Sequence, residues 1–60
     1  MINKITLKNR YRYLEKQYKE IEFAKDYWAM KKADYLVEQL DEKLVNVGLK
    51  MHRVYTMINL

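Results

Sequence analysis

Residues 21–37 read IEFAKDYWAMKKADYLV, and this stretch decides how the chain folds. If it were helical, its apolar side chains would point in almost every direction, from Ile21 through Trp28 to Leu36. A helix that is apolar all round is buried all round, because it has no polar face to present to water. The stretch is therefore the turn region of a hairpin, the centre of an oligomer or a surface that a partner covers.

Apolar residues with helical spacing lead into this stretch and out of it. The first stripe runs from Leu7 to Ile21 in steps of four and three, and the second runs from Met30 to Ile58 in the same steps. This spacing predicts α-helix on both sides. At about 100° per residue the second stripe is rotated by about 85° from the first, a rotation that one straight helix can also carry.

Two positions for a break in the helix fit these stripes. One lies between Asp26 and Asp34 and gives a two-helix hairpin. The other is the single glycine, Gly48, which would end a long helix and leave a short C-terminal one. The break at Gly48 is favoured, because no Gly, Pro, Asn or Ser stands between the two aspartates to form a turn.

The sequence thus predicts an all-α fold: a long amphipathic helix plus a short C-terminal helix, or alternatively a two-helix hairpin. Residues 1–60 form one small helical domain, because sixty residues allow no more. So short a chain buries little surface, and without cysteine it has no disulfide or cysteine-based zinc site to stabilise it. We expect oligomerisation or a partner to complete the core. The predicted oligomer core comprises Leu14, Tyr18, Ile21, Val37, Leu40, Leu44, Val47 and Met51.

The residue types needed for common catalytic sites are missing. His52 is the only histidine, and serine and cysteine are absent, so the usual nucleophile–histidine arrangements cannot form. Asp34, Glu38 and Glu42 have helical spacing, but no histidine stands where a helical metal site needs one. We interpret them as a solvated acidic face. We expect no enzymatic activity, no cofactor and no metal.

Positive charge gathers near the N-terminus, although the whole chain carries only +4. Residues 1–19 hold six basic residues against the single acid Glu15. A basic stripe on one helix could bind phosphates, and tyrosines nearby could stack on bases. An ordinary lysine-rich wet face is the alternative interpretation. The residues predicted for possible nucleic-acid binding are Lys8, Arg10, Arg12, Lys16 and Lys19.

Residues 4–8 have a second possible interpretation. Lys4, Thr6 and Lys8 alternate with apolar residues, as in a short strand with one polar face. This alternation resembles the DNA-binding strand of ribbon-helix-helix repressors. The resemblance covers these five residues only, and it implies a strand before the first helix.

The aromatic residues of the central stretch are the best candidates for recognition. Tyrosine and tryptophan bury large areas and lose few torsions on binding, and methionine adapts to irregular surfaces. They could instead fill the core of the protein's own oligomer. The predicted partner-binding residues are Phe23, Tyr27, Trp28, Met30 and Tyr35.

These observations predict a small helical protein–protein interaction module. It would act as a regulator, inhibitor or adaptor by occupying the surface of a partner protein. One alternative is nucleic-acid binding through the basic stripe, and a second is a structural or scaffolding homo-oligomer.

The sequence also allows expectations about location and source. No apolar run approaches the roughly 20 residues of a membrane span, and the N-terminus lacks the apolar core of a signal peptide, so we expect a cytoplasmic protein. Lysine, asparagine, isoleucine and tyrosine are abundant, as AT-rich genes encode them. A low-GC bacterium or its phage, with a host or defence protein as the target, is the corresponding hypothesis.

Overall fold

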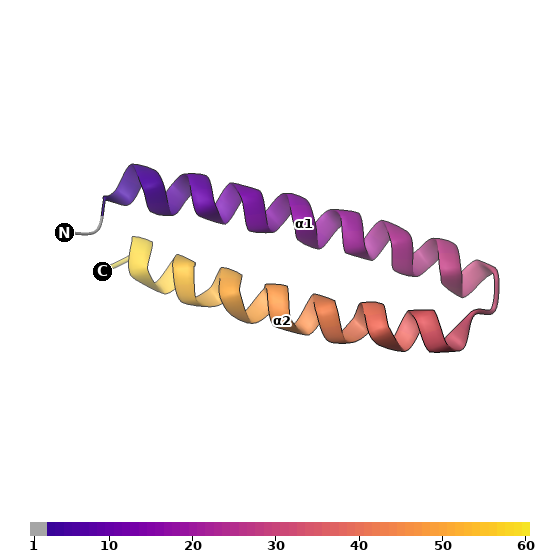
Figure 1. Ribbon diagram of the computed structural model, residues 1–60. Coiled ribbons are helices and arrows are strands. Elements are labelled where there is room, and N and C mark those ends of the chain that lie inside the picture. Colours follow the sequence, from indigo (N-terminus) through magenta and orange to yellow (C-terminus); the bar gives the residue numbers. More distant parts are fainter. Residues whose placement is uncertain (1–2) are drawn as a thin grey trace.

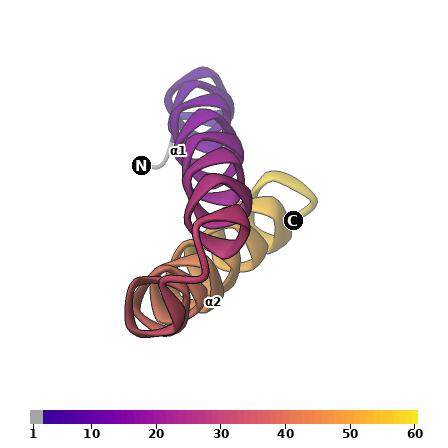
Figure 2. The same ribbon diagram turned by 90° about the vertical axis from the view of Figure 1, so that its right-hand side faces the viewer.

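The computed structural model describes residues 3–60 and shows a hairpin of two antiparallel helices (Figure 1). Helix α1 spans Lys4–Met30, and helix α2 spans Asp34–Ile58. Their axes cross at an angle, as the view from the closed end shows (Figure 2). The all-α prediction is confirmed. Of the two predicted arrangements, the structure has the hairpin, whose break lies between Asp26 and Asp34.

The turn at residues 31–33 is closed by a helix C-cap that needs no glycine. The backbone N–H of Ala33 donates to the carbonyl of Trp28 at 3.0 Å, and that of Lys32 donates to Ala29 at 3.0 Å. These are the two hydrogen bonds of a Schellman motif. Lys32 takes its left-handed position with φ 58°, a conformation that usually belongs to glycine. The turn was not favoured from the sequence because a lysine holds this position.

Gly48 lies in the interior of α2, so the predicted helix end at this residue is wrong. Its φ is not positive, as a left-handed cap would require. A Cβ atom built on Gly48 would lie 3.7 Å from Cε2 of Tyr18, which is an ordinary van der Waals distance. The glycine therefore marks a place where α2 passes close to a tyrosine of α1.

The N-terminus of α1 is capped by Asn3. Its side-chain Oδ1 accepts a hydrogen bond from the backbone N–H of Ile5 at 2.8 Å, as expected of an N-cap. The helix begins at Lys4, so residues 4–8 are helical. The strand implied by the resemblance to ribbon-helix-helix repressors is therefore wrong.

The two apolar stripes meet face to face and form the seam between the helices. Within residues 3–60, only Leu7, Leu14, Leu44 and Val54 are buried in it. Three of them make one cluster in the half of the hairpin that holds the termini, packed against Tyr11, Val47, Met51 and Ile58. The predicted oligomer core lies in this seam: Leu14 and Leu44 are buried, and Tyr18, Ile21, Val37, Leu40, Val47 and Met51 are half-buried. Whether a second copy covers them stays a prediction.

An ion pair interrupts the apolar seam toward the closed end. Lys25 follows Ile21 by four residues and so continues the stripe of α1, where it is half-buried. Its ammonium group pairs with the carboxylate of Asp41 on α2. The hydrogen bond to Asp41 raises the pKa of Lys25 above its usual value. A charged residue in an apolar seam favours the one register in which it finds its partner.

Replacing Gly48 with alanine should stabilise the hairpin. We expect Gly48→Ala to raise the free energy of unfolding by about 1 kcal/mol, since alanine favours the helix interior and the added Cβ meets no clash. Urea denaturation at a fixed protein concentration measures this change. A loss of stability would indicate that Gly48 takes a left-handed, helix-ending conformation after all.

Replacing Lys32 with glycine should also stabilise the protein. We expect Lys32→Gly to raise the free energy of unfolding by up to about 1 kcal/mol, because glycine adopts positive φ without a steric cost. The matched control is Lys31→Gly, in which φ is −84° and glycine should cost about 0.5–1 kcal/mol. Equal effects of the two substitutions on the denaturation midpoint would contradict this assignment of the turn.

The contribution of the Lys25–Asp41 pair should disappear at high pH. Because the pKa of Lys25 is raised in the folded state, the pair stabilises the fold fully below the ordinary lysine value of 10.5 and loses its effect as pH rises through the raised value. Asp41→Asn should therefore be less stable than the wild type at neutral pH, and the difference should shrink in strongly alkaline solution.

Thermal unfolding of the wild type and Asp41→Asn across this pH range tests the expectation, since the two proteins differ only at position 41. Glu42→Gln is the control, because it removes the neighbouring exposed carboxylate. Its difference from the wild type should stay flat with pH. A difference for Asp41→Asn that is equally flat would mean that Lys25 does not sense this carboxylate.

Candidate functional site

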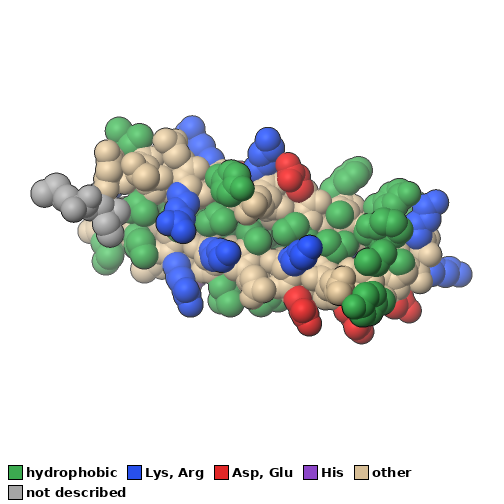
Figure 3. Space-filling view, in the orientation of Figure 1, with side chains coloured by type: hydrophobic (Ala, Val, Ile, Leu, Met, Phe, Trp, Pro, Cys, Tyr) green, Lys and Arg blue, Asp and Glu red, His purple; other side chains and the backbone are tan. Residues whose placement is uncertain are grey.

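The predicted partner-binding residues all lie exposed at the closed end of the hairpin. The exposed fractions are 76% for Phe23, 49% for Tyr27, 36% for Trp28, 83% for Met30 and 71% for Tyr35. We call this set the aromatic tip. Hydrophobic side chains gather at that end of the molecule (Figure 3). The structure does not hide these residues inside the hairpin, and their role in partner binding stays a prediction.

Local contacts hold part of the aromatic tip in a defined arrangement. The rings of Tyr27 and Trp28 meet edge to face with their centroids 5.0 Å apart, a favourable aromatic geometry. The ammonium of Lys31 lies 5.7 Å from the centroid of Tyr27, within cation–π range. On α2, the side chain of Gln39 donates to the hydroxyl of Tyr35 at 2.9 Å.

Three residues of the aromatic tip form a stripe along α1. Phe23, Tyr27 and Met30 stand at i, i+4 and i+7, so they project from one side of the helix. This side is not the seam, because all three are exposed. The stripe is therefore a second apolar face on α1, and α2 does not cover it.

The residues of the predicted basic stripe do not all lie together in the structure. Lys8, Arg12, Lys16 and Lys19 lie exposed along α1, and Lys19 pairs with Glu15 at 3.6 Å. Arg10 lies apart from them, because it lines a groove between the two helices. The structure thus separates a residue that the sequence grouped with the others.

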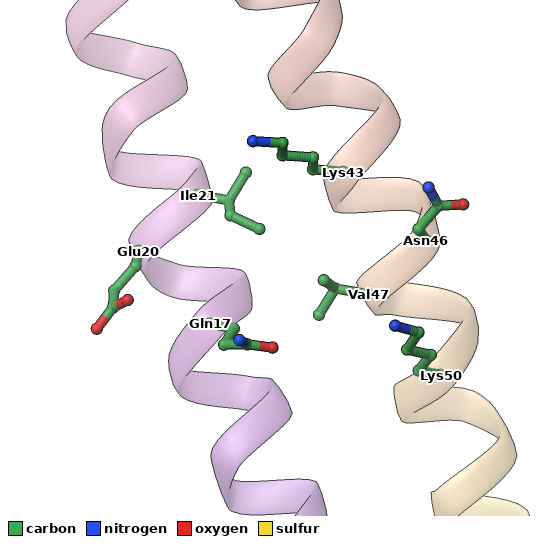
Figure 4. Close-up of a pocket in the computed structure, with 7 residues that line it drawn as sticks. All are labelled: Gln17, Glu20, Ile21, Lys43, Asn46, Val47 and Lys50. Atoms are coloured by element: carbon green, nitrogen blue, oxygen red, sulfur yellow. The ribbon is translucent and has the colours of Figure 1, made fainter.

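The groove holds basic residues that the sequence analysis did not connect with Arg10. It is made of two hollows that share Lys50. One is lined by Gln17, Glu20, Ile21, Lys43, Asn46, Val47 and Lys50 (Figure 4). The other is lined by Leu7, Arg10, Lys50, Arg53, Val54 and Met57. We call the two together the cationic groove.

The geometry of the cationic groove places charge around an apolar floor. Ile21 and Val47 face each other between the helices, and Lys43 reaches from α2 toward α1 beside them (Figure 4). Basic side chains gather over the line between the helices on this face (Figure 3). Lys43 and Lys50 are seven residues apart, the spacing that keeps two side chains beside the same seam. This spacing of Lys43 and Lys50 is visible in the sequence. Arg10 joins them only because the hairpin brings α1 beside α2.

A second groove between the helices differs in chemistry. It is lined by Tyr11, Tyr18, Gly48, Met51, His52 and Tyr55. The rings of Tyr11 and Tyr55 lie 6.2 Å apart and tilted toward each other. Its lining includes no lysine, arginine, aspartate or glutamate. This groove and the cationic groove therefore differ strongly in charge.

No arrangement for metal binding is found within residues 3–60, where acidic and histidine side chains do not gather in threes. Asp34, Glu38 and Glu42 lie exposed along α2. In the described part of the chain, neither helix is apolar enough over a sufficient length to cross a membrane.

Comparison of the chain with protein-family models, with curated proteins and with solved structures gives no match. The aromatic tip and the cationic groove are therefore the features of the chain that bear on its function.

Proposed function

We propose that the protein is a helical-hairpin interaction module that binds a partner protein through the aromatic tip. It acts as a regulator, inhibitor or adaptor by occupying the partner's surface. The observation that carries the proposal is the exposed stripe of Phe23, Tyr27 and Met30 on α1.

The spacing of this stripe fits a known mode of recognition between proteins. A helix that enters a hydrophobic groove presents anchors at i, i+4 and i+7, which are the positions of Phe23, Tyr27 and Met30. These anchors span about 10 Å along the helix axis. The partner surface that fits them is an apolar groove of similar length.

The hairpin supports such binding by fixing the helix in advance. An isolated helix must lose conformational entropy when it becomes ordered on binding, whereas α1 already packs against α2 before a partner arrives. The edge-to-face contact of Trp28 with Tyr27 restricts the central anchor further. Rigid aromatic residues of this kind carry much of the binding energy at protein interfaces.

The total exposed surface also favours association. The chain exposes 5320 Å². A compact monomer of 7.4 kDa exposes about 4,200 Å², roughly 1,100 Å² less. A standard protein–protein interface buries about 800 Å² of each partner. The excess is thus large enough for one interface.

The test is to replace two anchors with polar residues that still favour helix. We expect Phe23→Gln/Met30→Gln to lose a protein that the wild type captures from lysate of the source cell, treated with nuclease and read by mass spectrometry. With the purified partner, the loss should be about 30-fold or more in Kd, or about 2 kcal/mol.

The matched control is Val45→Gln/Leu49→Gln. It removes two apolar side chains of comparable exposure, 61% and 54%, from α2 instead of α1. This variant should retain the partner. Equal recovery of every captured protein by both variants would refute the proposed role of Phe23, Tyr27 and Met30 in binding the partner.

A second copy of the chain is the competing occupant of the same surface. Sedimentation equilibrium separates the two cases. If Phe23→Gln/Met30→Gln converts a wild-type dimer into a monomer and no foreign protein is lost, the aromatic tip serves self-association and the proposed interaction with a partner protein is wrong.

A further inference from the structure

The cationic groove carries an inference that does not depend on the aromatic tip. We infer that this groove binds the phosphate backbone of a single-stranded nucleic acid. The observation is the convergence of Arg10 from α1 with Lys43, Lys50 and Arg53 from α2 along one groove.

The four cations are available for a ligand. The ion pairs found within residues 3–60 are Lys19–Glu15 and Lys25–Asp41, so none of the four is engaged by an acid of the protein in that part of the chain. Glu20 is the one acidic residue among those that line the groove. The groove thus keeps a net positive charge.

Gathering like charges in one hollow opposes folding, because each cation repels its neighbours. Arg10, Lys50 and Arg53 line the same hollow, whose remaining lining residues Leu7, Val54 and Met57 are apolar. A bound polyanion removes this repulsion. Local arrangements that work against stability are expected at functional sites.

The shape of the groove favours a single strand over a duplex. The cations of α2 follow one line, with Lys50 about 4.5 Å along the axis from Arg53 and about 10 Å from Lys43. One flexible backbone can follow such a line within a groove. Gln17 and Asn46 on the lining add amide groups that can hydrogen-bond to base edges. A duplex is too wide to enter the space between two packed helices and would reach the cations only from outside.

Four phosphate contacts predict a measurable salt dependence. For a single strand, the logarithm of the binding constant should fall with the logarithm of salt concentration with a slope of about −3. Between 50 and 200 mM salt, this slope means a loss of about 50-fold in affinity.

The experiment measures fluorescence anisotropy with a labelled twelve-residue oligothymidine at several salt concentrations. Lys43→Gln/Lys50→Gln should weaken binding at least tenfold at 50 mM salt and reduce the slope to about −1.4. Circular dichroism should show unchanged helix content, because both lysines are exposed.

The matched control is Lys8→Gln/Lys16→Gln, which removes the same charge from the exposed face of α1. It should change the affinity less than threefold. If both double variants weaken binding equally, net charge and not the groove attracts the strand, and the inference is wrong.

Two competitors complete the test. A duplex of the same length and poly-glutamate should each displace the labelled strand only at concentrations well above that of unlabelled oligothymidine. Preference for the duplex would refute the single-strand assignment, and preference for poly-glutamate would identify an acidic protein surface as the ligand. Absence of binding at 50 mM salt would overturn the inference while leaving the aromatic tip unaffected.

Discussion

The contact between the apolar stripes of α1 and α2 is the interaction on which every other feature of this molecule depends. In the described part of the chain it buries four side chains, and the other residues of the seam are only half-buried. A two-helix hairpin has no third layer to cover the outer side of this seam. The same contact sets the positions of both grooves, because each groove is the space on one side of the seam. It also holds α1 as a rigid helix with its outward face free.

The sequence was sufficient for the helices but not for the turn. The three-four spacing predicted helix on both sides of residues 21–37, since this period reflects the geometry of the helix itself. The turn escaped prediction because Lys32 adopts a conformation that costs a lysine about 1–2 kcal/mol. Burial of the two apolar stripes against each other offsets that cost. A prediction from the local preferences of single residues does not include the free energy of this burial. For the same reason Gly48 was misinterpreted: glycine is the common residue at a helix end, yet here α2 continues through it past Tyr18.

The two candidate surfaces differ in how well they can be predicted from the sequence alone. Phe23, Tyr27 and Met30 are neighbours on one helix, so their grouping follows from spacing alone. The cationic groove needs Arg10 beside residues some forty positions later in the chain. That proximity exists only once the register of the hairpin is known, and the Lys25–Asp41 pair belongs to the contacts that fix it. The spacing of basic residues predicted that Arg10 belongs to a basic stripe along α1. In the folded chain Arg10 instead lies beside Lys50 and Arg53 of α2.

The aromatic tip lies toward the closed end of the hairpin, whereas the cationic groove runs from the middle of the hairpin toward the termini, and this arrangement has a consequence for stability. The buried cluster lies in the half that holds the termini, together with much of the cationic groove. The closed end has the interrupted seam, with Lys25 half-buried and Trp28 exposed. Regions with few buried apolar contacts open most easily. A partner that binds only when the closed end is folded would stabilise this end by mass action. The stabilisation is about 2.7 kcal/mol at a partner concentration 100 times Kd. Binding at the aromatic tip would therefore complete the part of the fold that the chain itself leaves weakest.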